Sequence, residues 1–505
     1  MCWKWIATLH RVFGRLLSLL FLLWFLSGFV MIFHTFPRAS QTYRLQRQQP
    51  LDGAVLPPLD TLLARLPDSV QLQGLSLEMR FDRPAVTLRG PGFADERYAD
   101  DGRPLEPFGE PVRLQTLRLW CDAPVERVDT LWQVDQWIPF ESLRRELPVY
   151  RYRFADAARH ELYMASRDGR VLQFTDRRSR FWAWLGAIPH WVYFTLLRQH
   201  QTLWIETVKW AAGIGCLMCL AGWLLGLYRW GHHRRTAGRW ENPYKKRWYR
   251  WHFASGLIFG LFALTFALSG LMSLVELPDW LKKAPRTATA ATAAEGRPRG
   301  RSRGTGEAGM APAAAYRLDY RRLLDPADSV KTLAFASWEG HPCYQLVVGS
   351  GETRYIDAAD SASVRPFRLT EERIRARMAR ELPDSVRWEL ALLTAFDDDY
   401  FARQAERAPL PVWRVTVDDA MHTRLYFHPD RLTLRRVDDD TRTRSLLYQG
   451  LHTLHFKFLT DRPALWYVAM FGLLLGGTLL SLSGVVLTLQ WLRRTVRKIR
   501  TTSSH

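Results

Sequence analysis

Two apolar stretches of the chain match each other without a gap: residues 10–28, HRVFGRLLSLLFLLWFLSG, and residues 252–270, HFASGLIFGLFALTFALSG. Each stretch begins with a histidine, has a glycine four residues later and ends in Ser-Gly, and the offset between them is a constant 242 residues. Both are long enough to cross a bilayer as a helix, which takes about 20 residues. The repeat therefore predicts two transmembrane helices that carry polar and small residues at the same depths.

The repeated residues lie on one face of each predicted helix. Positions 18 residues apart complete about five helical turns and share a face. A histidine in an apolar span is a candidate functional residue, because burying an imidazole without a partner is costly. Two histidines at equal depth, each with small residues on its face, indicate a pair of ligands facing a flat cofactor. The face consists of His10, Gly14 and Gly28 in the first helix and of His252, Gly256 and Gly270 in the second.

Four apolar stretches of the chain are predicted to span a membrane. We expect the first to be a retained span rather than a cleavable signal peptide, because its apolar run is too long and no small-x-small cleavage site follows it. The expected segments are a first transmembrane helix (1–36), an outer domain (37–200), a second helix (201–229), a basic loop (230–250), a third helix (251–276), a linker (284–315), a second outer domain (316–462), a fourth helix (463–492) and a tail (493–505).

The net charge of +20 comes mainly from residues that flank the predicted spans. Cytoplasmic segments of membrane proteins carry an excess of Lys and Arg. We therefore expect a multi-pass membrane protein, with both termini and the basic loop cytoplasmic and the two long segments outside. Such charge orients the protein in lipid, and no nucleic-acid partner is expected. The flanking basic residues are Lys4, Arg11, Arg15, Arg229, Arg234, Arg235, Arg239, Lys245, Lys246, Arg247, Arg250, Arg493, Arg494, Arg497, Lys498 and Arg500.

A second set of matching segments extends the repeat to the whole chain. At an offset of 262 residues, His190, Trp204 and Gly222 recur as His452, Trp466 and Gly484. Each half then consists of a span, an outer domain and a span, and the two halves have the same orientation in the membrane. The expected fold is a four-helix transmembrane bundle from a duplicated two-span unit, with two extracytoplasmic α+β domains. The core of such a bundle commonly holds a cofactor.

Both outer segments combine predicted strands with helix. Runs of β-branched and aromatic residues predict strands over 150–154, 161–165, 333–337, 344–348, 412–417 and 424–427. Thr370 is a candidate N-cap for a helix that reaches Leu382. The linker 284–315 is rich in Ala, Gly, Arg and Thr and is expected to be disordered.

Haem is the cofactor that suits the two span histidines, because histidine is a common axial ligand and two facing histidines give six-coordinate iron. Alternatively, each imidazole bonds a backbone carbonyl or a lipid headgroup. His190 and His452 form a second equivalent pair on the outer side, for which a structural or interfacial role is also open. His34, His200 and His455 lack a histidine counterpart and remain reserve ligands.

Sequence motifs of other chemistries are absent. The chain has no Cys-x2-Cys outside the second span, no His-Glu-x-x-His, no P-loop, no nucleophile elbow and no Gly-x-Gly-x-x-Gly after a predicted strand. Its five cysteines do not support a disulfide framework. Because the cytoplasmic segments are too short for a flavin or nicotinamide domain, any electron donor has to be a separate molecule.

With these residues in view, the chain resembles the PepSY-associated transmembrane family, of the iron-regulated membrane protein or ferric-siderophore reductase type, over nearly its whole length. The resemblance implies a location in the bacterial inner membrane and PepSY-like outer domains. It also implies two b-type haems, the inner one held by His10 and His252 and the outer one by His190 and His452. One motif departs from the family pattern, since Pro189-His190-Trp191-Val192 stands where many relatives have Leu-His-x-Gly. The motifs that carry the resemblance are Leu9-His10-Arg11 with Gly14 and Ser27-Gly28, Trp251-His252 with Gly256 and Ser269-Gly270, Leu451-His452, and Ser483-Gly484.

The activity implied by this resemblance is electron transfer across the membrane, that of a membrane ferric reductase. A quinol or a cytoplasmic reductase would be the donor and a ferric siderophore or other ferric chelate the acceptor.

Two other classes of function stay open. A haem-free regulatory or scaffold protein would use its PepSY-like domains to bind a protease or peptide. A metal permease would need ionisable residues in mid-span, where the second span offers only Glu206 and Lys209, both near its outer end.

Overall fold

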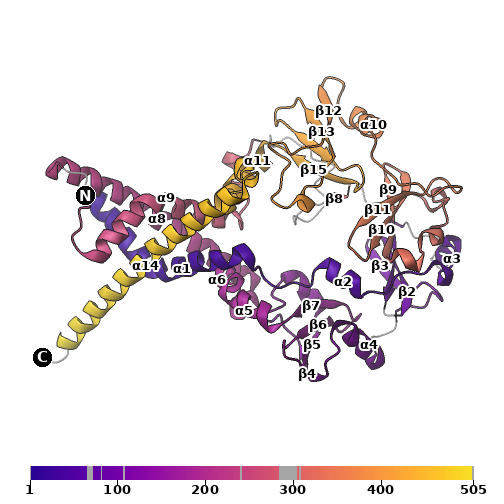
Figure 1. Ribbon diagram of the computed structural model, residues 1–505, viewed down its shortest axis with the longest axis horizontal. Helices are drawn as coiled ribbons and strands as arrows, with labels where there is room; N and C mark the ends of the chain where they lie inside the picture. The colour runs from indigo at the N-terminus through magenta and orange to yellow at the C-terminus, as the bar shows by residue number, and fades with distance from the viewer. Residues whose placement is uncertain are drawn as a thin grey trace.

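The structure, a computed structural model, describes residues 2–64, 72–80, 82–105, 109–238, 241–283, 304–305 and 309–502. Figure 1 shows two regions, a bundle of long helices and an assembly of β-sheets beside one end of it. Both ends of the chain lie at the end of the bundle that is remote from the sheets. The bundle and the sheets therefore occupy separate parts of the molecule.

Four helices in the described part of the chain are long and apolar enough to cross a membrane, as the sequence predicts. Around the bundle, α1 packs on α8, α8 on α9, α9 on α14, and α14 on α1. In this ring α1 and α9 stand diagonally opposite each other. The helices are α1 (Cys2–Phe33), α8 (Gln201–Ala237), α9 (Arg247–Met272) and α14 (Pro463–Thr502).

The outside of the bundle is apolar and its inside is tightly packed. Leu16, Trp210 and Val468 are each about 70 % exposed (70 %, 68 % and 71 %), a surface that suits lipid rather than water. Inside, a Cβ on Gly477 would lie 2.3 Å from Cε1 of Phe25, so glycine is needed at this close approach. Small residues thus let the helices approach each other, as in other membrane bundles.

A six-stranded antiparallel sheet combines strands from both outer segments. Its order is β11–β10–β9–β1–β2–β3, and Leu77 of β1 lies opposite Leu333 of β9. Both leucines are fully buried in a core shared by the two segments. The strands are β1 (Gly74–Arg80), β2 (Arg83–Gly90), β3 (Phe93–Tyr98), β9 (Val330–Trp338), β10 (His341–Val348) and β11 (Thr353–Asp357).

This shared sheet differs from the expected division into two separate outer domains, 37–200 and 316–462. Each three-stranded meander alone would leave one edge strand, β1 or β9, with unpaired backbone donors and acceptors. Pairing the two edges satisfies these groups and buries apolar side chains of both strands. Because the pairing joins residues far apart in the chain, no local sequence pattern predicts it.

Two smaller antiparallel sheets belong each to one segment. Both contain the strands predicted from the sequence, and Thr370 caps the predicted helix by accepting the N–H of Arg373 at 3.4 Å. The first sheet, in order β4–β5–β6–β7, has strands Val125–Leu131, Val149–Phe154, Glu161–Ala165 and Val171–Thr175. The second, in order β12–β13–β14–β15–β8, has strands Trp388–Leu393, Val412–Val417, Arg424–Phe427, Thr433–Val437 and Gly304–Thr305.

The remaining helices of the described chain are short. The predicted linker 284–315 falls largely outside the described residues, except for 304–305 and 309–315. The α-helices are α2 (Gln41–Arg47), α3 (Leu59–Leu63), α4 (Glu110–Trp120), α5 (Arg177–Leu185), α6 (Ala187–Trp191), α7 (Thr195–Arg198), α10 (Glu371–Glu381), α11 (Asp439–Ser445), α12 (Leu451–Thr453) and α13 (Lys457–Thr460). Short 3-10 helices cover Gly53–Val55, Glu141–Glu146, Asp279–Leu281, Ala313–Ala315, Tyr320–Leu323, Pro326–Asp328 and Ala405–Arg407, and a π-turn covers Leu446–Gly450.

Candidate functional site

Two histidines of the spans face each other inside the bundle. His10 comes from α1 and His252 from α9, and their ring centroids are 6.0 Å apart with 36° between the ring planes. Both residues lie near the beginning of their helices, at the end of the bundle that carries the chain termini. The structure therefore brings together the two histidines that the sequence repeat singles out.

A second pair of histidines lies on short helices at the other end of the bundle. His190 is on α6 and His452 on α12, and their ring centroids are 5.9 Å apart with 63° between the planes. The two short helices are not spans, but α6 packs on α1 and α12 packs on α9. Each pair is thus associated with the diagonal helices α1 and α9.

A tryptophan at the start of the following span ties down each of these short helices. Nε1 of Trp204 donates a hydrogen bond of 2.9 Å to the carbonyl of Trp191, one residue after His190. Nε1 of Trp466 donates one of 2.8 Å to the carbonyl of Thr453, one residue after His452. The two halves of the chain therefore hold their outer histidines by the same local contact.

In all four histidines the Nδ1 atom is hydrogen-bonded to an oxygen. A histidine that binds a metal through Nε2 typically donates its Nδ1–H to such an oxygen, which fixes the tautomer and the orientation of the ring. The four oxygens are the carbonyl of Met218 at 3.0 Å from His10, Oγ of Ser483 at 2.9 Å from His252, Oγ of Ser27 at 3.0 Å from His190, and Oγ of Ser269 at 3.0 Å from His452.

The hydroxyl contacts of the three serines determine which atom of each imidazole carries the hydrogen. Each serine donates its only hydroxyl hydrogen to the carbonyl three residues earlier, at 3.0 Å for Ser27, 3.0 Å for Ser269 and 2.7 Å for Ser483. Its oxygen can then only accept a hydrogen bond from Nδ1–H. The Met218 carbonyl imposes the same direction on His10. All four rings therefore keep a free lone pair on Nε2, as a metal ligand requires.

His10 differs from the other three histidines in its partner. Ala221 stands in the repeat where the second half has Ser483, so α8 offers His10 no hydroxyl at this position. The imidazole bonds the backbone carbonyl of Met218 instead. The ring orientation of His10 thus depends on the backbone of α8 rather than on a side chain.

The closest glycine to His10 is also on α8. A Cβ added to Gly222 would lie 2.4 Å from Cε1 of His10, a distance that real Cβ atoms do not show. At the equivalent Gly484, the Cβ would lie 3.7 Å from Cε1 of His252, which is ordinary contact. The lack of a side chain at Gly222 is therefore what allows the observed position of His10.

The four glycines predicted to share the histidine face have different surroundings. Only Gly270 has a histidine as the nearest neighbour of an added Cβ, and Gly14 faces open space. The nearest atoms are Cε1 of His452 at 3.9 Å for Gly270, Cδ1 of Leu480 at 3.5 Å for Gly256 and Cδ2 of Leu474 at 2.8 Å for Gly28, with nothing within 4 Å of Gly14.

The three reserve histidines have contacts of their own. His34 stacks on Trp182 with ring centroids 4.4 Å apart, and His455 stacks on Phe401 at 4.6 Å. His200 is the residue that precedes α8. The structure places none of these three rings in the two facing pairs.

Sequence reasoning assigned no role to Ser27, Ser269 and Ser483, although the repeat displays them. The signal is the Ser-Gly dipeptide, which occurs near the end of the first and third spans and within the fourth. Without coordinates, nothing shows that these hydroxyls point at a histidine from another helix.

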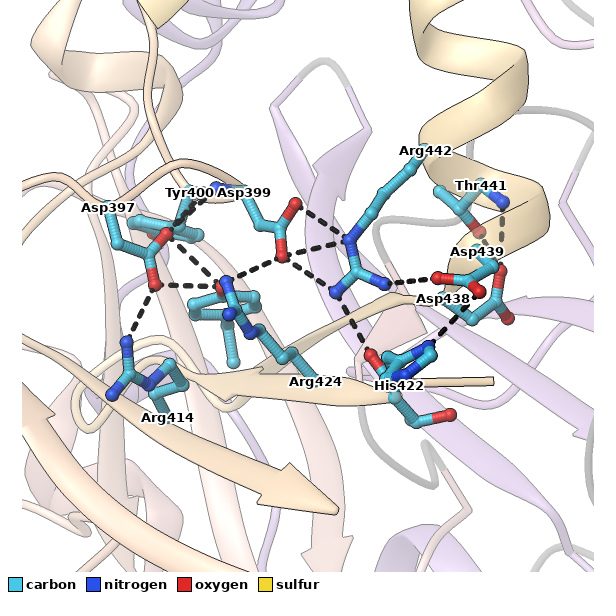
Figure 2. A network of polar contacts seen from close by, with 12 residues as sticks. Asp397, Asp399, Tyr400, Arg414, His422, Arg424, Asp438, Asp439, Thr441 and Arg442 are labelled. Carbon is cyan, nitrogen blue, oxygen red and sulfur yellow. Dashed lines mark hydrogen bonds and ion pairs between the residues drawn. The ribbon is translucent and has the colours of Figure 1, made fainter. Parts of the chain in front are cut away.

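Ion pairs anchor the segment that leads into His452 (Figure 2). Arg442 of α11 donates to Asp399 at 2.7 Å, and Arg424 of β14 donates to the same carboxylate at 2.8 Å. Also in α11, hydrogen bonding by Lys283 lowers the pKa of Asp439 to about 2. The Asp399 contacts tie the helix before the outer histidine to strand β14, and the Lys283 contact ties it to the segment that follows α9.

The fold and the site define a membrane protein with four candidate spans, β-sheet-rich regions outside the bundle and two pairs of facing histidines. Its sequence matches the family described as PepSY-associated TM region over residues 7–494. The chain therefore belongs to the PepSY-associated transmembrane family, as its resemblance indicates. No curated protein matches the sequence significantly.

Proposed function

We propose that the protein is a b-type haem protein that moves electrons across the bacterial inner membrane and reduces an extracytoplasmic ferric chelate, such as a ferric siderophore. The observation that carries this proposal is the two facing imidazole pairs, His10 with His252 and His190 with His452. In both pairs Nδ1 is engaged by an oxygen and Nε2 is left free. Six-coordinate haem needs two such nitrogens on one iron.

The spacing of the rings supports the same assignment. Imidazole–metal bonds are about 2 Å long, so two ligands on one ion hold their nitrogens about 4 Å apart. The centroid separations of 6.0 and 5.9 Å are longer than this nitrogen–nitrogen distance, because each also includes the distance from the nitrogen to the centre of its ring on both sides. The ring spacing in each pair therefore supports our proposal of two bis-histidine haems.

Bound haem would supply a one-electron couple at each pair, with a potential set by ligation, burial and nearby charge. The protein's own groups would hold and orient the ligands. Ser27 and Ser269 fix the outer imidazoles, while Ser483 and the Met218 carbonyl fix the inner ones. The apolar side chains of the bundle core would keep water away from the inner pair.

The orientation we propose has the chain termini in the cytoplasm. Basic residues flank the spans at the end of the bundle that carries the termini, which agrees with the positive-inside rule. The sheets then lie outside, where the acceptor is, and a quinol or a cytoplasmic reductase supplies electrons as a separate partner. We also propose that the two halves arose by duplication, which the equivalent Trp204 and Trp466 contacts support.

A reduced-minus-oxidised difference spectrum of the full-length protein in detergent, with haem assayed per chain, tests the proposal. We expect the Soret and α bands of low-spin b-type haem and two haems per chain. Oxidation of the reduced protein by a ferric chelate, followed at the α band, tests the acceptor. Protein made with ample haem supply that shows no Soret band would overturn the proposal and favour a haem-free PepSY scaffold.

A further inference from the structure

Three side chains with metal-binding atoms converge in the first outer segment, away from the histidine pairs. The ligand atoms of Cys121, Asp156 and His160 all lie within 4.8 Å of one another. Cys121 directly follows α4, and the other two residues belong to the turn between β5 and β6. Within the described ranges, no other group of three such side chains converges in this way. We call it the Cys121–Asp156–His160 cluster.

Surrounding contacts hold the cluster in place. Nδ1 of His160 lies 2.7 Å from Oδ2 of Asp156, and the imidazole stacks on Phe174 with ring centroids 4.8 Å apart and 9° between the planes. The Asp156 carboxylate also accepts the backbone N–H of Ala158 at 3.2 Å and of His160 at 2.9 Å. The imidazole and the carboxylate are therefore ordered before any ion binds.

We propose that the Cys121–Asp156–His160 cluster binds a divalent transition-metal ion of the Zn²⁺ class. A thiolate, an imidazole and a carboxylate are the three ligand types that zinc takes in proteins, and three protein ligands leave a fourth position for water or an exogenous ligand. Bonds of about 2.0–2.3 Å put neighbouring ligand atoms roughly 3–4 Å apart, so a contraction of about 1 Å closes the site. The ion takes the place of the proton shared by His160 and Asp156.

Space for a fourth ligand borders the cluster. A cavity of about 590 Å³ is lined by His160 together with four arginines and two glutamates: Arg127, Arg153, Arg159, Arg180, Glu126 and Glu161. Water or a small anion can therefore reach the side of the site that His160 faces. This binding function is additional to the proposed electron transfer and does not depend on haem.

The second half of the chain provides a matched control. In the second outer segment, His422 lies in the corresponding turn, between β13 and β14, and also has a carboxylate partner, Asp439, 3.1 Å from its Nδ1. Within the described residues, no third side chain with a metal-binding atom converges on this pair. A carboxylate–imidazole pair without a thiol ligand is thus present in the same protein.

The test uses full-length protein in detergent and ZnCl2 as the probe. We expect one Zn²⁺ per chain after equilibrium dialysis, and at least tenfold slower alkylation of Cys121 by iodoacetamide when Zn²⁺ is present, measured by peptide mass spectrometry. Cys121→Ser, Asp156→Asn and His160→Asn should each weaken zinc binding at least tenfold, whereas His422→Asn should not. The Soret band should be unchanged in all four variants. A failure of the zinc proposal can therefore be distinguished from a failure of the haem proposal.

Two outcomes would overturn the metal site. One is alkylation of Cys121 in the unaltered chain at the same rate with and without Zn²⁺, a result that does not depend on any variant folding. The other is equal zinc binding by the Cys121→Ser, His160→Asn and His422→Asn proteins, which would assign the ion to a different place.

Discussion

Ser269 of α9 and His452 of α12 are joined by a hydrogen bond of 3.0 Å between Oγ and Nδ1. Ser27 of α1 holds His190 in the same way and at the same distance. The helices that orient the outer histidines are thus the ones that carry the inner histidines. On α1, His10 and Ser27 are 17 residues apart, or roughly 25 Å along the helix. Each diagonal helix therefore serves both pairs, one at each end.

Removing the serine hydroxyl should weaken the outer haem selectively. In Ser27→Ala and Ser269→Ala, Nδ1 of the outer histidine loses its acceptor, and loss of such a partner typically costs 10–100-fold in metal affinity. We expect faster loss of one haem and altered low-spin electron paramagnetic resonance g-values. Ser27→Thr should restore both, because it keeps the hydroxyl. Ser273→Ala, at a serine that bonds only its own helix backbone, serves as the control, and equal haem loss there would contradict the prediction.

Single histidine substitutions should remove haem in pairs. His10→Ala and His252→Ala should each remove the same haem and leave the second largely intact, because the two rings face each other. Haem per chain and the residual spectrum measure this outcome. His34→Ala should retain both haems, since the ring of His34 stacks on Trp182. Full haem content in both the His10 and the His252 variants would show that the inner assignment is wrong.

A methyl group at Gly222 should disturb the inner site. The added Cβ would lie 2.4 Å from Cε1 of His10, so either the ring or α8 has to move. Overpacking costs about 1–3 kcal/mol and should appear here as loss of the haem that depends on His10. Gly213→Ala on the same helix is the matched control, because nothing lies within 4 Å of its Cβ. Equal effects at both positions would mean that helix packing in general, not the contact with His10, is responsible.

Local sequence patterns predicted the spans and the outer hairpins, because each depends on residues close together in the chain. The histidine pairs join distant residues, and the internal repeat predicted them. The predicted glycine face was less informative. Gly14 and Gly256 lie one turn from the histidines of their own helices, yet the glycine against His10 is Gly222 of a neighbouring helix. The pairing of β1 with β9 could not be predicted from the sequence either. Helix rotation and long-range strand pairing are set by packing between distant segments, and a single sequence does not display them.

The membrane topology can be tested without reference to haem. Reporter fusions in the Arg229–Arg250 loop and after Arg500 should report a cytoplasmic location, because these segments carry the basic flanks. Fusions near Asp100 and in the 284–315 linker should report an external one. A cytoplasmic signal at Asp100 would mean that the first apolar helix does not cross the membrane.

The hairpin around His428 should loosen in acid. Nδ1 of this buried imidazole accepts the backbone N–H of Asp430 at 3.1 Å and of Arg431 at 3.2 Å, so protonation at Nδ1 would break both bonds. Burial, and secondarily the charge of Arg431, lowers its pKa from 6.5 to about 4. Between these two values the unfolded chain binds more protons than the folded one, and stability falls as the pH falls.

Hydrogen exchange of residues 424–437, corrected for the intrinsic pH dependence, measures this effect. Protection should be constant above about pH 6.5 and decrease toward pH 4, by at most about 3 kcal/mol, since one pKa unit corresponds to about 1.4 kcal/mol. The substitution His428→Asn should flatten the profile, because an asparagine oxygen can accept the same two N–H groups without titrating in this range. An unchanged pH profile in His428→Asn would show that another group controls the hairpin.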